Sequence, residues 1–465
     1  MNSPMQPCAS IGRPRSFPGW IFALTFALVY SAHWQSGGGN PDSRFAAVRA
    51  MTMDHRLAID PYVGWSDDWA QTPDGHYYSN KAPGPALVAY PFMLVHDRLF
   101  PPADPGKPYS LTVKVLLCIL LQILPFAWFS ALALNLLAER GVSRAGQTFA
   151  ALALFFGNTA DPFMMVYFGH GLAAWLLVAC LVAFARRRFF WVGMTFGWAL
   201  LSEFSVALLL LPLALSLLEL MGRRDRLRAT GLVVLGGLLP GLLWAWYHQS
   251  CFGGVLTIAQ QFQNPRFVEK TVSPRGSLGA VIGLWPSPAI LWEVLFGARR
   301  GLLFTQPWVL LVAPLLALWR PRSVPRALGI FATVGLVEFI WMNASFAGWH
   351  GGDTAGPRYL GVILPPVALA AGFFHDRAPR WLRGIGWALL GVAVSLNALI
   401  FAWSSLIPER EPAMWPYFWR WAWHSTRTEG RLAFFTVAVL VAVGVTAWRA
   451  RGTSRSIGTS ADRAA

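Results

Sequence analysis

Charged residues are scarce in this sequence. Only 13% of its 465 residues are Asp, Glu, Lys or Arg, and 55% are hydrophobic. Soluble domains carry about 25% charged residues, so a soluble globular protein is excluded. The mean hydropathy of +0.45 also excludes intrinsic disorder, which requires low hydrophobicity. The composition therefore predicts an integral membrane protein.

Cysteine is also rare, and the acidic residues are few. Cys8, Cys118, Cys180 and Cys251 have no paired spacing, so neither a disulfide framework nor a zinc site is predicted. The net charge is +16, but the basic residues form short clusters between apolar segments. This pattern is typical of membrane topology and contact with anionic lipids, and we predict no nucleic-acid partner. Phosphate-binding loops, dinucleotide fingerprints and HExxH motifs are absent from the sequence.

Apolar runs separated by basic or polar breaks predict an all-α polytopic membrane protein with about 12 transmembrane helices. The predicted spans are residues 17–34, 110–137, 146–160, 169–185, 189–202, 204–221, 229–248, 301–319, 327–344, 359–374, 384–404 and 432–448. Basic clusters fall in every second connection, which predicts that these connections and both termini are cytoplasmic. The chain then divides into a cytoplasmic N-terminal segment (1–16), one transmembrane domain (17–448) and a disordered cytoplasmic tail (449–465).

The first outer loop, residues 36–109, is long and acidic. Loops of this length in compact proteins tend to be functional. Acidic residues do not set membrane topology, so their concentration here needs another cause. The loop contains eight of the 22 acidic residues, namely Asp42, Asp54, Asp60, Asp67, Asp68, Asp74, Asp97 and Asp104.

Asp42 lies at the start of this loop, just before a helix predicted from Ser43 to about Arg56. One interpretation is an N-cap, because Asp is a favoured cap and suits the positive end of a helix. The other is a general base held at the membrane surface. The two roles are compatible, because a cap fixes the carboxylate in place.

Lys81 precedes an apolar segment, 84–97, that is too short to span a membrane. Pro85 suits the first turn of a helix, so Lys81 would lie at a helix N-terminus, where its charge opposes the helix dipole. A bound anion such as a lipid phosphate would resolve this conflict. The alternative is a solvated lysine near lipid head groups. His76 and Tyr78 lie just upstream, and the tyrosine is expected in an interfacial aromatic belt.

Two later outer connections also carry candidate residues. Arg299 and Arg300 precede a span on the outer side, where either phosphate binding or snorkelling to head groups would explain them. The turn 349–360 is rich in glycine and is a plausible wall of a site, although its acid and its arginine could pair with each other. Its polar side chains are His350, Asp353 and Arg358.

Two further features of the sequence concern a span and an aromatic run. Glu338 is the acid most clearly inside a predicted span, where acids are costly and usually functional. The aromatic run 414–423 suits a sugar-stacking surface, but an interfacial belt is the simpler interpretation.

Together these motifs resemble the polytopic GT-C glycosyltransferases that use polyprenyl-phosphate sugars, such as protein O-mannosyltransferases, lipid A aminoarabinose transferases and bacterial family-39-like members. Asp42–Ala46 resembles the family's acidic-x-Arg-aromatic-Ala motif, and Gly75–Gly84 its His-Tyr-Tyr-Ser-Asp-Lys-Pro-Pro-Gly motif. Phe296–Phe304 and Trp349–Leu360 resemble its Arg-Gly-Leu-Phe-Phe and Gly-Pro-Arg-Tyr-Leu segments. The four similarities follow the family's order between about residues 36 and 375.

The resemblance implies a glycosyltransferase of the bacterial inner membrane with its site facing the periplasm. It implies that Asp42 is the catalytic base, that Lys81 binds the donor phosphate with Arg44 nearby, and that transfer inverts the anomeric carbon. The donor would be a polyprenyl-phosphate-linked sugar, the acceptor an envelope glycan, lipid or protein, and a divalent metal is compatible with the site. Further phosphate- or substrate-binding candidates are His76, Tyr78, Arg300 and Arg358, with His350, Asp353 and Glu338 as secondary ones.

The sequence departs from the family pattern at two positions. Pro41 precedes a single acid where the family often has an acidic pair, and Asn80 replaces the acid before Lys81. The chief alternative function is a transporter or flippase of a lipid-linked sugar, and a non-catalytic scaffold is a third. Transporters tend to show internal repeats and polar residues at mid-membrane. This chain shows no repeat and concentrates its motifs in outer loops, which favours the enzyme.

Overall fold

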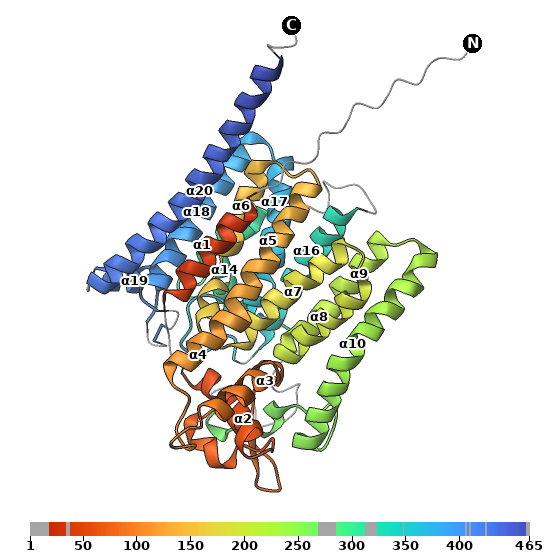
Figure 1. Ribbon diagram of the computed structural model, residues 1–465, viewed down its shortest axis with the longest axis vertical. Coiled ribbons are helices and arrows are strands. Elements are labelled where there is room, and N and C mark those ends of the chain that lie inside the picture. The colour runs from red at the N-terminus through yellow and green to blue at the C-terminus, as the bar shows by residue number, and fades with distance from the viewer. Residues whose placement is uncertain are drawn as a thin grey trace.

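A computed structural model describes residues 18–33, 38–267, 285–311, 323–346, 348–404, 407–408, 411–423 and 426–461. Its helices form an elongated bundle, with the first outer loop gathered at one end (Figure 1). We call this the loop end. The predicted N-terminal segment 1–16 and residues 312–319 of a predicted span lie outside the described residues.

Most elements are helices, joined by short 3-10 turns. The helices of the bundle are α1 (Gly19–Ser31), α4 (Leu111–Cys118), α5 (Leu124–Glu139), α6 (Arg144–Phe155), α7 (Gly169–Ala185), α8 (Phe189–Ser202), α9 (Leu210–Leu220), α10 (Arg223–Phe252), α14 (Leu302–Thr305), α16 (Val324–Ser345), α17 (Leu364–Arg377), α18 (Arg380–Ala402) and α20 (Thr426–Ala461). The other helices are α2 (Gly39–Met53), α3 (Gly84–Leu99), α13 (Pro288–Phe296) and α19 (Met414–Ala422). The 3-10 turns are η1 (Asp60–Trp65), η3 (Asp161–Met165), η4 (Phe204–Leu209), η5 (Ala259–Phe262), η6 (Pro307–Leu311) and η7 (Arg358–Val362).

Serine caps begin several of these helices. The hydroxyls of Ser110, Ser143, Ser287 and Ser323 each accept a hydrogen bond from the backbone N–H three residues later. A capping hydroxyl satisfies an amide that has no partner within the helix. At the other end of a helix, Gly253 terminates α10 with a left-handed conformation, as C-terminal glycines commonly do.

The second predicted span is a continuous helix with a π-helical segment, Ile119–Ile123, in its middle. Pro125 follows this segment and has no N–H for the carbonyl one turn earlier. That carbonyl, of Leu121, instead accepts a hydrogen bond from the indole of Trp175 at 2.9 Å. The span is thereby tied to α7 without an unsatisfied buried carbonyl.

The structure confirms a helical membrane protein. Five described helices are long and apolar enough to cross a membrane, and α1, α7, α8 and the segment Phe204–Leu220 are shorter apolar helices. The surfaces of α10 and α20 expose large apolar side chains, as lipid-facing helices do. Figure 1 shows these two helices on opposite flanks, α10 beside α8 and α20 beside α18. The number of spans and their orientation stay predictions.

One prediction from sequence needs correction here. Besides its helices the chain contains a short antiparallel hairpin, β1 (Trp69–Gln71) with β2 (Tyr77–Ser79). Strands of three residues are too short to show the alternation that predicts a strand. The last helix, α20, extends to Ala461. The division of the chain into an N-terminal segment, a transmembrane domain and a tail stays a prediction.

The basic connections predicted to be cytoplasmic meet at the end opposite the loop end. Arg140, after α5, donates a hydrogen bond to the carbonyl of Ala185 at 3.0 Å. Arg186, after α7, pairs with Glu139 at 3.2 Å. Since α7 begins at the loop end and runs away from it, these contacts join two basic connections at the far end of the bundle.

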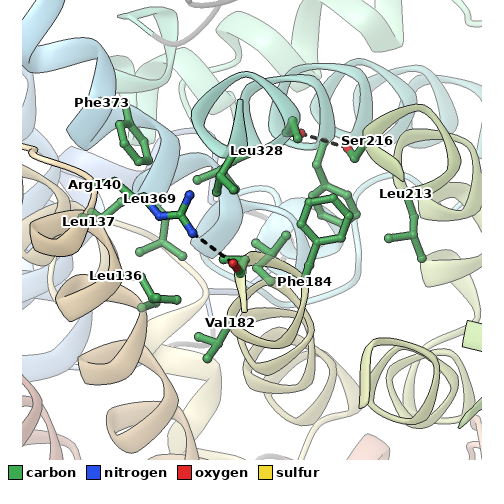
Figure 2. A pocket seen from close by; sticks show the side chains of 16 residues that line it. Leu136, Leu137, Arg140, Val182, Phe184, Leu213, Ser216, Leu328, Leu369 and Phe373 are labelled. Atoms are coloured by element: carbon green, nitrogen blue, oxygen red, sulfur yellow. Dashed lines mark hydrogen bonds between the residues drawn. The ribbon is translucent and has the colours of Figure 1, made fainter. Parts of the chain in front are cut away.

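An apolar cavity of about 40 Å³ lies near this far end, between α5, α7, α9, α16 and α17 (Figure 2). Its two polar residues are both engaged. Arg140 bonds to Ala185, and Ser216 bonds to the carbonyl of Ala327 at 2.9 Å. The cavity is too small for a sugar and offers no free polar group, so it does not suit a sugar-binding site.

Candidate active site

The first outer loop folds into a small cap of α2, η1, the hairpin and α3. Gly38 begins it with a φ of 71°, a backbone conformation that favours glycine. The hydroxyl of Ser43 on α2 bonds to the Ser79 hydroxyl at 2.7 Å and to the carbonyl of Asp68. This joins α2 to the hairpin, and the hairpin leads directly to Lys81. The segment after α10 also contacts the hairpin, because the Asn264 N–H donates to the Trp69 carbonyl at 3.0 Å.

Lys81 lies between the hairpin and α3, as the sequence predicts, but its charge is already paired. Its ammonium contacts the Asp68 carboxylate at 2.8 Å, and the side chains are only 20% and 16% exposed. Asp68 also lies beside the first residue of α2, where the helix dipole favours a negative charge. Lys81 is therefore a held, largely buried cation rather than a solvated one.

Asp42 lies in the first turn of α2 and makes no capping hydrogen bond. The expected N-cap is therefore wrong, because α2 begins at Gly39 instead of Ser43. The carboxylate instead pairs with Lys114 of α4, and the two side chains are 21% and 12% exposed. This pair links the start of the cap to the start of the second span.

Arg44 extends from α2 toward the loop ends of α7 and α8. It is 3% exposed and donates to Asn40 on its own helix. Its guanidinium lies 2.8 Å from the position that a Cβ would take on Gly169, and the Glu203 carboxylate lies 3.2 Å from the same position. Gly169 therefore leaves the space in which this arginine and this carboxylate approach each other.

Glu203 ends α8 and pairs with His170 at the start of α7, 2.9 Å away. Both side chains are largely buried, at 17% and 7% exposure. Neither residue belongs to a motif that predicted the site. The only signal was a histidine at the outer boundary of a predicted span and an acid between two spans.

Arg358 is the third cation near this position. It begins η7, and its guanidinium lies over the rings of Phe168 and Tyr359, 5.6 and 4.9 Å from their centroids. The Nε atoms of Arg44 and Arg358 are both buried without a hydrogen-bond partner. Buried donors of this kind are costly unless a ligand satisfies them.

The charges of this group act on one another. Burial lowers the pKa of Arg44 to about 10, with the carboxylates of Glu203 and Asp68 opposing the shift. Burial also lowers the pKa of Lys81, an effect that Asp68 opposes and that Arg44 and Arg358 reinforce. Burial by itself would raise the pKa of Asp68, but Lys81 outweighs it and holds that pKa below its usual range. We call Arg44, Asp68, Lys81, His170, Glu203 and Arg358 the charge cluster.

His76 and Tyr78 do not reach this cluster through any described contact. His76 is exposed on the hairpin and pairs with Asp60 at 3.0 Å. Tyr78 is buried instead of lying in an exposed belt, and its ring packs against Phe252 of α10 at 5.5 Å.

Of the candidates later in the sequence, the side chains of Arg300 and His350 form hydrogen bonds within the turn, whereas those of Asp353 and Glu338 form none with the described residues. Arg300 is 5% exposed and donates to the carbonyl of Gly352, while His350 accepts from the Gly352 N–H at 3.1 Å. Asp353 is exposed and does not pair with Arg358. Glu338 lies in α16, where its Oε2 is buried without a hydrogen-bond partner.

No three His, Cys, Asp or Glu side chains in the described ranges are grouped to hold a metal ion. The cluster contains three cations, Arg44, Lys81 and Arg358, with two carboxylates and a histidine. Such a site suits an anionic group with a polar neighbour better than a metal ion. Besides His170, the sequence analysis missed Lys114, whose charge within a predicted apolar span was the available signal.

Comparison with solved structures identifies the type of fold. The chain is similar to the archaeal oligosaccharyltransferase AglB from Archaeoglobus fulgidus, solved with an inhibitory peptide and a dolichol-phosphate. The TM-score is 0.50 at 14% identity, over 90% of this chain and 59% of that chain. It is also similar to ArnT from Cupriavidus metallidurans bound to undecaprenyl phosphate, with a TM-score of 0.46 at 15% identity, over 92% of this chain and 75% of that one.

No family model matches the sequence, and the search of curated proteins gives no significant match. The structural similarity nevertheless confirms the fold that the motifs predict. The chain has the fold of the GT-C membrane glycosyltransferases. It spans less than two thirds of the oligosaccharyltransferase to which it is similar.

Proposed function

We propose that the protein is an integral-membrane glycosyltransferase that moves a hexose or pentose from a polyprenyl-phosphate donor to an acceptor. The observation that carries this proposal is the charge cluster, which holds three partly or fully buried cations in a fold of the GT-C type. The proposal includes twelve spans in a bacterial inner membrane, cytoplasmic termini and a site facing the periplasm.

Lys81, Arg44 and Arg358 are the proposed ligands of the donor phosphate. As the sugar departs, its bond to the phosphate oxygen breaks and negative charge develops on that phosphate. Cations held in a poorly hydrated position stabilise such charge strongly. The unsatisfied Nε atoms of Arg44 and Arg358 supply donors that a phosphate oxygen would accept.

Asp42 is the proposed general base. An acceptor hydroxyl attacks the anomeric carbon from the face opposite the phosphate, its proton passes to a carboxylate, and the configuration inverts. The pairing with Lys114 fixes the position of Asp42 on α2, two residues before Arg44. The donor's prenyl chain would remain in the lipid, so no nucleotide-sugar domain is needed.

Donor binding is tested with the purified chain and undecaprenyl phosphate. We expect Lys81→Met to weaken binding roughly tenfold to hundredfold, because hydrogen bonds to charged groups contribute about 1.5–3 kcal/mol. Lys107→Met is the matched control, since Lys107 belongs to the same loop but is 79% exposed. Equal affinities for the two variants would contradict the assignment of Lys81.

Transfer is tested separately, because the donor sugar must first be identified. Mass spectrometry of envelope glycans and polyprenyl-phosphate sugars in a deletion strain should show a donor that accumulates and a product that lacks its sugar. With that pair in hand, Asp42→Asn should lower the transfer rate by about 10²–10⁴ while lipid-phosphate binding persists. Asp104→Asn, at an exposed position in the same loop, is the control. Unchanged transfer by Asp42→Asn would exclude it as the base.

A further inference from the structure

A second, much larger cavity opens at the outer ends of α18, α19 and α20. Its volume is about 700 Å³, enough for a small saccharide. The cavity is formed by three chain segments and one turn between α16 and η7. The lining residues are Asp353, Trp403, Ser404, Pro408, Tyr417, Arg427, Thr428 and Arg431.

One wall of this cavity carries two arginines. Arg427 and Arg431 are one turn apart on α20, so they project from the same face of the helix. Neither forms an ion pair with a described residue, and Arg431 makes one long hydrogen bond, 3.5 Å, to the carbonyl of Ala402. Like charges at this spacing repel each other, so the arrangement does not serve helix stability. Their forked guanidinium groups match the oxygens of phosphate or carboxylate.

The adjoining wall is aromatic and fixed in position. Trp403 stacks on Trp421 with centroids 5.0 Å apart and an angle of 12° between the rings. Its indole N–H donates to the Tyr417 hydroxyl at 3.2 Å. Aromatic faces pack well against the C–H faces of sugar rings, and polar groups at their edges bond to hydroxyls. Asp353 also lines the cavity and provides carboxylate oxygens that accept bonds from hydroxyls.

The cavity is connected to the charge cluster through one turn. Asp353 lines the cavity, and Arg358, five residues later, belongs to the cluster. Gly352, next to Asp353, is held by Arg300, and the adjacent Arg299 donates to the Pro408 carbonyl at 2.9 Å in the cavity wall. A ligand in the cavity would therefore lie beside the segment that carries a proposed phosphate ligand.

We propose that the α18–α20 cavity binds an anionic saccharide, with its phosphate or carboxylate on Arg427 and Arg431 and its hydroxyls against Asp353 and the aromatic wall. This inference rests on the proposed glycosyltransferase function and names the class of acceptor for it. The acceptor is then a glycan that carries negative charge near the sugar hydroxyl to be modified.

Binding is tested with the full chain in nanodiscs of phosphatidylcholine, with glucose 1-phosphate, glucose and inorganic phosphate as probes in calorimetric titration. We expect glucose 1-phosphate to bind more tightly than either fragment. The double variant Arg427→Gln/Arg431→Gln should weaken its binding by at least about tenfold, because two charge-assisted contacts are lost. Arg420→Gln is the control, since Arg420 is exposed on α19 and does not line the cavity.

The charge-conserving variant Arg427→Lys/Arg431→Lys should bind with intermediate affinity, which separates loss of contact from loss of folding. Wild-type affinity in the glutamine double variant overturns the proposal. Loss of glucose 1-phosphate binding in Lys81→Met also overturns it, because the probe would then occupy the donor site. Competition by nanodiscs containing phosphatidylglycerol overturns it in favour of a lipid head group.

The inference and the proposed function fail in different assays. If undecaprenyl phosphate does not bind but glucose 1-phosphate binds through Arg427 and Arg431, the saccharide site stands and the transferase proposal falls. If undecaprenyl phosphate binds through Lys81 but the cavity variants leave glucose 1-phosphate binding unchanged, only the cavity proposal falls.

Discussion

At the scale of single residues, Asp68 is the charge partner that favours the protonated form of Lys81. Both side chains are largely buried, and each is the nearest opposite charge of the other, 2.8 Å apart. A buried lysine without a counter-charge tends to lose its proton. Asp68 therefore keeps Lys81 positioned and charged until a phosphate arrives, which makes it a positioning residue in the proposed mechanism.

Replacing Asp68 should change how donor binding depends on pH. Asp68 raises the pKa of Lys81 against the lowering effect of burial, so Asp68→Asn should lower that pKa further. Phosphate binding needs the ammonium form. As the pH rises, affinity for undecaprenyl phosphate should therefore begin to fall at a lower pH in Asp68→Asn than in the wild type.

The control for this experiment is Asp67→Asn, which removes an exposed neighbouring carboxylate that pairs with Arg266. Its profile of affinity against pH should follow the wild type. Superimposable profiles for Asp68→Asn and the wild type would show that Asp68 does not set the ionisation of Lys81.

Sequence patterns located some residues of the site but not their partners. The position of Lys81 before α3 followed from Pro85 and the short apolar segment, both of which are local signals. The pairing of Lys81 with Asp68 depends on the hairpin, and that of Glu203 with His170 depends on the packing of α7 on α8. Contacts of this kind arise from tertiary structure, so no local pattern reports them.

At the scale of elements, the close approach of α3 to α8 fixes the cap on the bundle. Gly84 begins α3, and a Cβ at this position would lie 2.7 Å from the backbone of Leu201 and Ser202. Those two residues precede Glu203 of the charge cluster. The absence of a side chain at Gly84 therefore lets the segment after Lys81 rest directly on the helix that carries Glu203.

A methyl group at Gly84 should separate these elements. In an open position, glycine to alanine in a helix is favourable by about 0.5–1 kcal/mol. Here backbone atoms must move, so we expect Gly84→Ala to cost about 1–3 kcal/mol, as overpacking does. The lower thermal unfolding midpoint should be accompanied by weaker binding of undecaprenyl phosphate.

Gly64→Ala in η1 is the matched control, because a Cβ there meets no atom within 4 Å. It should leave both the midpoint and the affinity close to wild type. A midpoint for Gly84→Ala at or above that of the control would mean that α3 does not depend on this close contact.

Local sequence patterns predict the bounds of some elements of this chain better than those of others, for physical reasons. The bounds of α7 and α8 match their predicted ranges, because basic residues or a single polar break terminate long apolar runs. The predicted helix begins at Ser43, whereas α2 begins at Gly39. Gly39, Asn40 and Pro41 suggest a turn in the sequence, although each is tolerated in the first turn of a helix. The strands of the hairpin are too short to show a period, and tertiary contacts with α2 and with the segment after α10 hold it in place.

At the scale of the whole molecule, the connections between helices form one group at the loop end and another at the far end. The first outer loop, the loop ends of α7 and α8 and the charge cluster lie together. The basic connections after α5 and α7 meet at the other end. Both of these basic connections are predicted to be cytoplasmic, and that orientation stays a prediction.

The orientation of the bundle in the membrane can be tested by labelling single cysteines. The chain's other cysteines must not react, so Cys8 is first replaced by serine, while Cys118, Cys180 and Cys251 are buried. Asp74→Cys then marks the exposed turn of the hairpin, and Arg188→Cys marks the exposed basic turn between α7 and α8. A membrane-impermeant maleimide added to spheroplasts should label the first and spare the second, and permeabilised cells should show labelling of both.

The physical reason is that short arginine-rich connections are retained on the cytoplasmic side, which places the first outer loop on the opposite side. If spheroplasts label Arg188→Cys and spare Asp74→Cys, the bundle is inverted and the charge cluster faces the cytoplasm. A lipid-linked sugar would then have to present its head group on that side, and the proposed periplasmic transfer could not take place. The experiment therefore decides on which side of the membrane the cations of the cluster can meet a donor phosphate.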